Sequence, residues 1–146
     1  MIAVDTNILV YAHREESEWH QQADECLTGL AESGKPWVIP WPCIHEFLSI
    51  ATNPRIYVPP TPMSIAKEQV ECWLESPTLS LIGEGLSYWT ILVELLGAGQ
   101  IKGALVHDAR IAALCKLHGV TELWTADRDF NRFRALNVLN PLVSAG

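Results

Sequence analysis

The sequence predicts an α/β fold in three layers, a short parallel sheet with helices on both of its faces. Short apolar runs with the length of buried strands alternate along the chain with longer segments whose apolar residues recur at helical spacing. Gly, Pro and Asn residues separate most of these segments. Strands that alternate with helices are typical of a parallel sheet, because each helix carries the chain back to the start of the next strand.

Only polar residues separate the first strand from the first helix. Residues 2–4 are apolar, Asp5, Thr6 and Asn7 follow, and the apolar run resumes at Ile8 with no Gly or Pro between. We therefore expect a strand over 2–4 that passes directly into a helix. Asp5 is either a cap of this helix, since Asp is a preferred capping residue, or the first member of a site, since ligands collect at the carboxyl ends of parallel strands.

The middle of the chain has clear helix and strand boundaries. Gly34 ends one apolar periodicity, prolines bracket the run PWVIP, and Pro54 ends the next helical pattern. Three prolines in RIYVPPTP exclude a regular helix, so that segment is interpreted as an ordered loop or a hinge. In chain order we expect a helix over 19–34, a strand over 36–40, a helix over 43–52, the loop over 55–62, a helix over 64–77 and a strand over 78–82.

The last third of the chain repeats the alternation. Glycines end both of its long helical patterns, and an apolar strand precedes the residues TADRD. We expect helices over 87–99 and 105–118, a strand over 120–124, a short helix around Phe130 and Phe133, and a final strand over 135–139.

Composition predicts one domain. A chain of 146 residues with 49% hydrophobic residues suits a single core. No stretch approaches the roughly 20 apolar residues of a membrane span, and no signal peptide is recognisable, so a cytoplasmic protein without membrane contact is expected. The four cysteines have no paired spacing and are interpreted as reduced core thiols rather than a zinc site or a disulfide: Cys26, Cys43, Cys72 and Cys115.

The charge balance argues against a protein that holds nucleic acid by a general basic surface. The formal net charge is −7 and the isoelectric point is near 5.1. Acids that converge on divalent cations would still form a site that receives phosphate, because bound cations become the dominant local charges. An acidic balance also suits a basic protein partner.

Four acids fit poorly with a purely structural role. Glu46 and Asp108 each occupy a helical face that is otherwise apolar or small, with no Lys or Arg at i±3 or i±4. Asp127 ends a strand as Asp5 does, and two strand ends of a parallel sheet can lie side by side. Each acid also has a structural interpretation, as a cap, a solvated residue or a first-turn acid. Together they favour one shared site.

A convergent set of carboxylates predicts metal-assisted phosphodiester hydrolysis. Oxygen ligands without Cys or a paired His motif suit Mg²⁺ or Mn²⁺. Two such ions about 3.5–4 Å apart stabilise both the attacking and the leaving oxygen of a phosphodiester. The sequence contains no phosphate-binding loop, no dinucleotide turn and no nucleophile elbow.

Four segments of the chain resemble one known family. DTNILVYA, HEFL, VHDARIAALCKLHGV and LWTADRDFNRF are, in this order and spacing, similar to PIN-domain ribonucleases, specifically VapC toxins of bacterial toxin-antitoxin pairs. The resemblance implies a PIN-like fold and a Mg²⁺- or Mn²⁺-dependent endoribonuclease that is neutralised by a VapB-like antitoxin and forms a homodimer. The acids of the family correspond to Asp5, Glu46, Asp108 and Asp127, with Asp129 as an assisting ligand and Thr6, Asn7 and Thr125 as polar neighbours.

Contacts to RNA and two other functions remain open at this level. Five basic residues are candidates for RNA backbone contact, each with a solvated surface charge as the alternative: Arg14, Lys102, Arg110, Arg128 and Arg132. A haloacid-dehalogenase-like phosphatase also places an Asp after its first strand, but needs a second Asp two residues on, where this chain has Asn7. A non-catalytic PIN-like module that binds only a protein is the other alternative.

Overall fold

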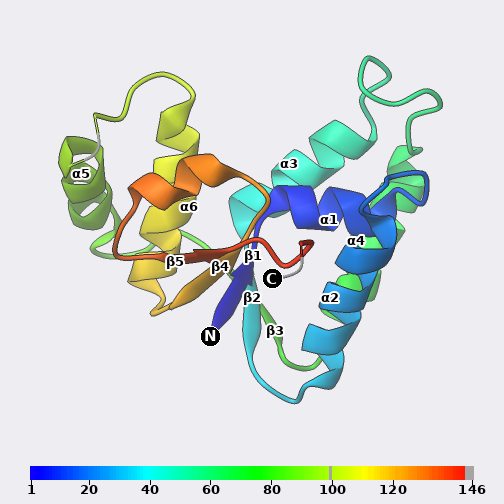
Figure 1. Cartoon of the computed structure of the whole chain (residues 1–146), viewed down its shortest axis with the longest axis horizontal. Helices are drawn as coiled ribbons and strands as arrows, with labels where there is room; N and C mark the ends of the chain where they lie inside the picture. Colours follow the sequence, from blue (N-terminus) through cyan, green and yellow to red (C-terminus); the bar gives the residue numbers. More distant parts are fainter. Residues whose placement is uncertain (99, 144–146) are drawn as a thin grey trace.

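A five-stranded parallel sheet forms the centre of the molecule in the computed structural model, which describes residues 1–98 and 100–143 (Figure 1). Every neighbouring pair of strands is parallel, as the sequence predicts. The spatial order is β3-β2-β1-β4-β5, which puts the first strand in the middle. The strands are β1 (Ile2–Val4), β2 (Trp37–Pro40), β3 (Leu79–Ile82), β4 (Glu122–Trp124) and β5 (Asn137–Leu139).

Two groups of helices cover the sheet, which confirms the predicted three-layer α/β class. One group consists of α1 (Thr6–His13), α2 (His20–Glu32), α3 (Trp41–Ala51) and α4 (Met63–Leu74). The other consists of α5 (Tyr88–Ala98) and α6 (Leu105–Leu117), which pack on each other. The two groups lie on opposite sides of the sheet in Figure 1. A 3-10 helix, η1 (Arg128–Arg132), follows β4.

Several boundaries differ from the sequence expectation for local reasons. α3 begins at Trp41 rather than at 43, because Pro42 lies in the first turn, where its missing N–H is tolerated. α4 ends at Leu74, short of the residues that precede Pro77, since a residue before proline disfavours helical geometry. The last two strands are shorter than expected and begin only where their pairing with the neighbouring strand begins.

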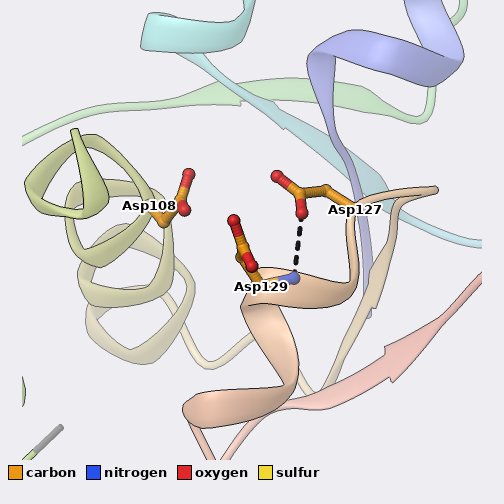
Figure 2. A group of neighbouring side chains, drawn as sticks. All are labelled: Asp108, Asp127 and Asp129. Carbon is orange, nitrogen blue, oxygen red and sulfur yellow. Dashed lines mark hydrogen bonds between the residues drawn. The ribbon is translucent and has the colours of Figure 1, made fainter.

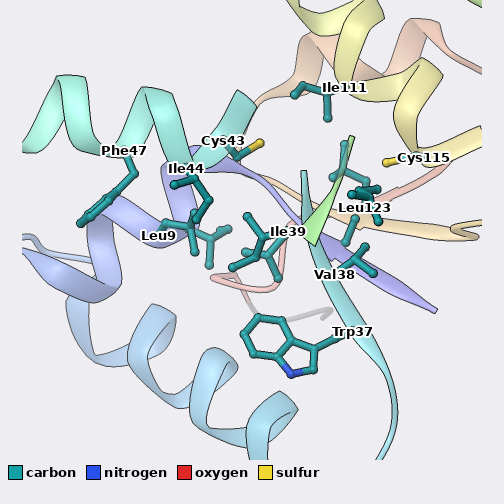
Figure 3. Packing of buried hydrophobic residues seen from close by; sticks show 14 of the residues in the cluster. Leu9, Trp37, Val38, Ile39, Cys43, Ile44, Phe47, Ile111, Cys115 and Leu123 are labelled. Atoms are coloured by element: carbon teal, nitrogen blue, oxygen red, sulfur yellow. The ribbon is translucent and has the colours of Figure 1, made fainter. Parts of the chain in front are cut away.

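The hydrophobic core lies against the central strand β1 and its two neighbours. Trp37 and Ile39 of β2, Phe47 of α3 and Leu123 of β4 are almost fully buried in it (Figure 3). The apolar helix α5 packs against this core only through partly buried side chains. It has no buried residue, and Trp89 on it is 69% exposed, because α5 packs outside α6 rather than on the sheet.

The expectation of four core thiols is wrong for half of them. Cys43 and Cys115 are buried, but Cys26 is only half-buried and Cys72 is exposed. Cys72 precedes Trp73, which faces the core, so the turn of the helix directs Cys72 outward. All four are free thiols. Among the residues described, no helix is long and apolar enough to cross a membrane.

Candidate metal centre

The carboxyl ends of β1 and β4 bring two distant segments together. The two strands are direct neighbours, with Val4 opposite Trp124, and the N–H of Asp5 donates to the carbonyl oxygen of Trp124 at 3.0 Å. The residues that follow both strands therefore meet at one edge of the sheet. This confirms the expectation that the two strand ends lie side by side.

Three carboxylates gather at this edge. Asp108, near the start of α6, and Asp127 and Asp129, at the start of η1, each offer an oxygen that lies within 4.8 Å of the other two (Figure 2). Asp108 and Asp127 are half-buried, whereas Asp129 is exposed. Asp127 also caps η1, since its Oδ1 accepts a hydrogen bond from the N–H of Asp129 at 2.9 Å. The structural interpretation of Asp127 as a cap is therefore confirmed, and the cap leaves its carboxylate beside the other two.

Asp5 lies beside these three acids but is held separately. Asp5 occupies the N-cap position of α1, but its side chain, which is 6% exposed, makes no capping hydrogen bond. The Cys43 thiol donates to Oδ1 at 3.4 Å, the Thr125 hydroxyl donates to Oδ2 at 2.8 Å, and the Asn7 amide reaches Oδ2 at 3.4 Å. These donors replace the water that burial removes from the carboxylate.

The hydroxyl of Thr125 connects both strand ends. It accepts from the Asn7 amide and from the N–H of Asp127, each at 3.0 Å, while it donates to Asp5. Asn7 in turn accepts from the N–H of Ala126 at 3.0 Å. One small network thus fixes the backbone on which Asp127 is mounted.

Glu46 reaches the site from α3, but not in the way expected. Glu46 is exposed. The buried face of α3 contains Cys43 and Phe47 but not Glu46. The Thr6 hydroxyl donates to its Oε2 at 2.9 Å and so links it to the residue after Asp5. Neither Glu46 nor Asp5 belongs to the group of three that lies within 4.8 Å.

The acids influence one another electrostatically. The pKa of Asp108 is raised to about 6, first by burial and then by the negative charges of the other acids, in the order Asp127, Asp5, Asp129 and Glu46. The pKa of Asp5 is also raised, by burial above all, although hydrogen bonds from Thr6, Thr125 and Cys43 oppose the shift. A half-buried cluster of carboxylate oxygens is unfavourable by itself and fits a hard divalent cation.

The five basic candidates lie in different surroundings. Arg14 bonds to Glu16, to the Thr61 hydroxyl and to the carbonyl oxygen of Pro59, so it holds the proline-rich loop and does not stand free for phosphate. Arg110 pairs with Glu84 at 2.7 Å. By contrast, Lys102 and Arg132 line one cavity. Arg128 is exposed at the start of η1.

Sequence reasoning missed one contact of the site. Cys43 counted as an apolar neighbour of Glu46, three residues earlier on the same helix, yet its thiol contacts Asp5. The only signal was its position in the first turn of a helix that directly follows a central strand.

The chain is similar to proteins of one known family. The profile of the PIN domain family matches residues 2–136. VapC ribonuclease Mb2897 of Mycobacterium bovis is 32% identical over 142 residues, which are 97% of this chain and 96% of the relative. Ribonuclease VapC48 of Mycobacterium tuberculosis is 28% identical over 138 residues, or 94% of each chain.

A solved structure shares the fold. The crystal structure of VapBC2 from Rickettsia felis bound to a DNA fragment from their promoter superimposes with a TM-score of 0.68 at 19% identity, over 95% of this chain and 98% of the other. The family profile spans both strand ends and all five acids. The chain therefore belongs to the PIN-domain family and, within it, to the VapC ribonucleases.

Proposed function

We propose that this protein is a metal-dependent endoribonuclease toxin that hydrolyses RNA phosphodiester bonds and that residues 1–146 form one PIN-like nuclease domain. The observation that carries the proposal is the group formed by Asp108, Asp127 and Asp129, whose oxygens lie within 4.8 Å of one another beside the buried Asp5. Membership of the VapC ribonucleases supports the same reaction class.

The carboxylates would hold Mg²⁺ or Mn²⁺. Asp108, Asp127 and Asp129 would be its main ligands, because their oxygens lie within 4.8 Å of one another. The carboxylates of Asp5 and Glu46 are close enough to raise the pKa of Asp108. When bound, such a cation lowers the pKa of a water molecule and neutralises charge on the scissile phosphate. The remaining polar residues act on the acids themselves.

Three polar side chains orient the acids. Thr125 and Asn7 hold Asp5 and the backbone of Asp127, and Thr6 orients Glu46. Because the donors to Asp5 and to the backbone of Asp127 are fixed by contacts within the fold, these two acids need little reorganisation when a substrate phosphate arrives. No side-chain nucleophile is required.

Site-directed variants test the proposal. We expect Asp108→Asn and Asp127→Asn each to lower RNA cleavage with Mg²⁺ or Mn²⁺ by about 100-fold or more, since loss of even an outer-shell partner of a metal site costs 10- to 100-fold. Asp24→Asn is the matched control, because Asp24 is an exposed acid on α2. Cleavage of a structured RNA by both site variants at the rate of the parent protein would contradict the assignment and favour a non-catalytic binding module.

The phosphatase alternative does not fit this chain. Asn7, where that chemistry needs an acid, donates to Thr125 and accepts from the N–H of Ala126, so its amide serves as a bridge. Membership of the PIN-domain family likewise separates the chain from that class.

The partners follow from the same proposal. The likeness to the VapBC2 complex supports a VapB-like antitoxin as a partner. The antitoxin would inhibit the nuclease in the cytoplasm, where its RNA substrate would be found. A homodimer is supported by the exposed apolar side chains Leu86, Trp89 and Val93, which follow helical spacing at and before α5. Sedimentation of the purified parent protein and of the Trp89→Glu variant tests the proposed homodimer.

A further inference from the structure

Four of the ten lysine and arginine side chains of this acidic protein line a single cavity. Its volume is about 910 Å³, and residues from the end of α5, from α6 and from η1 with the segment after it surround it. Glu94 is the one carboxylate among its described lining residues. We call it the basic cavity, and its cationic side chains are Lys102, Lys116, Arg132 and Arg134.

The cations of the basic cavity form only weak ion pairs, or none, within the part of the chain that the structure describes. Lys116 approaches Glu94 at 3.5 Å with both side chains exposed, and a nitrogen of Arg132 lies 3.9 Å from the Asp129 carboxylate. Exposed pairs of this kind contribute little. Lys102 and Arg134 are exposed and form no ion pair within residues 1–98 and 100–143. The cavity therefore has positive charge to offer to an anion.

The basic cavity adjoins the metal centre at two points. Leu105, one of its lining residues, lies one helical turn before Asp108 on α6. The Nε of Arg132 donates to the backbone oxygen of Asp129 at 3.0 Å. A polyanion whose phosphate reaches the three carboxylates thus has a cationic surface directly beside it.

We propose that the basic cavity binds the phosphate backbone of RNA next to the scissile bond, an inference that rests on the proposed nuclease function. Phosphate contacts position a nucleic acid without reading its sequence, and Lys and Arg are the residues that make most of them. Local concentration of cations explains how a chain with a net charge of −7 holds RNA beside five acids. Continuity with the metal centre favours RNA over an acidic protein segment as the occupant.

Salt dependence of binding tests this inference without cleavage. The dissociation constant of a short fluorescein-labelled single-stranded RNA is measured by anisotropy in EDTA over a range of KCl concentrations. Each lost phosphate contact lowers the magnitude of the slope of log K against log salt, here called the slope, by about 0.7 for single strands, so Lys102→Ala with Arg134→Ala should lower it by about 1.4. Lys35→Ala with Lys67→Ala removes the same charge outside the cavity and should leave the slope unchanged.

The controls separate charge from fold and from function. Lys102→Arg with Arg134→Lys should keep the slope of the parent protein, and all variants should keep its melting temperature. Equal slopes for the two alanine pairs would overturn the inference. It would also be overturned if poly-L-glutamate lost affinity through Lys102→Ala with Arg134→Ala while RNA did not, since the occupant would then be an acidic protein.

The proposed nuclease function fails on different evidence. If metal-dependent cleavage is normal but the alanine substitutions in the basic cavity leave the slope unchanged, the cavity is not an RNA site and the nuclease function is unaffected. A lowered slope in a protein that cleaves no RNA would support the cavity as an RNA site and refute the nuclease.

Discussion

Thr125 is the residue on which the candidate site depends most directly. It is buried, and its one hydroxyl contacts an acid after β1, an amide of α1 and the N–H of Asp127. Buried polar groups that lose a partner carry a desolvation penalty of about 1–3 kcal/mol. The hydroxyl therefore matters both for the fold and for the position of two carboxylates.

We expect Thr125→Val to lower the free energy of unfolding by about 1–3 kcal/mol and RNA cleavage by about 10-fold or more, because Asp5 and the N–H of Asp127 lose their shared partner. Thr125→Ser keeps the hydroxyl and should stay close to the parent in both. Urea denaturation and a cleavage assay measure the two effects. If the Val variant cleaved RNA as fast as the Ser variant, the network would have no positioning role.

Asp5 and Glu46 show how differently two acids of one site are held. Asp5 is buried and accepts three side-chain hydrogen bonds, whereas Glu46 is exposed and accepts one from Thr6. The buried carboxylate is rigid because its partners are fixed. The exposed one is free to reorient around that single contact.

At the scale of elements, the end of α1 is tied to the proline-rich loop between α3 and α4. Arg14 donates to the carbonyl oxygen of Pro59 and to the Thr61 hydroxyl, each at 3.1 Å, and its guanidinium lies 4.2 Å from the centre of the Tyr57 ring. The N–H of Thr61 also donates to the last residue of α3 at 2.8 Å. These contacts make the segment an ordered loop rather than a hinge.

We expect Arg14→Ala to lower the free energy of unfolding by about 1–3 kcal/mol and to speed proteolysis of the loop, since its two hydrogen bonds and its cation–π contact to the loop are lost. Arg14→Lys keeps the charge but not the planar fork, so it should restore only part of the stability. Limited proteolysis and urea denaturation check this. A weaker salt dependence of RNA binding at unchanged stability would instead restore Arg14 as a phosphate contact.

At the scale of the whole molecule, the acidic centre couples folding to pH. The pKa of Asp108 is raised from 3.8 to about 6, mainly by burial and then by the surrounding carboxylates. Between those values the folded state binds more protons than the unfolded state. The contribution of Asp108 to stability is therefore full below about pH 4 and is lost as the pH rises through about 6.

We therefore predict that, in EDTA, the stability of the parent relative to Asp108→Asn falls as the pH rises from about 4 to about 6, because Asn does not ionise. Urea denaturation across this range measures the difference, and parallel curves for the two proteins would contradict it.

Mn²⁺ at about 100 times its dissociation constant should stabilise the parent near neutral pH by about 2.7 kcal/mol, and the Asp108→Asn variant by clearly less.

The sequence by itself determined the α/β class and the meeting of two acids. Alternating strands and helices imply a parallel sheet, and parallel strands end at the same edge, so the sequence predicts that the strand ends carrying Asp5 and Asp127 lie close together. The apolar helical faces around Glu46 and Asp108 add these two acids, and the resemblance to VapC toxins adds Asp129. These inferences rest on periodicity and local order, which a linear sequence contains.

Only the tertiary structure decided how the site is held and what lies beside it. The thiol of Cys43 on Asp5, the exposure of Glu46 and the use of Arg14 as a loop anchor depend on which face of a helix meets which neighbour. The basic cavity joins side chains from three helices and the segments next to them. Burial and contact across such distances in sequence are set by packing, and no local pattern records them.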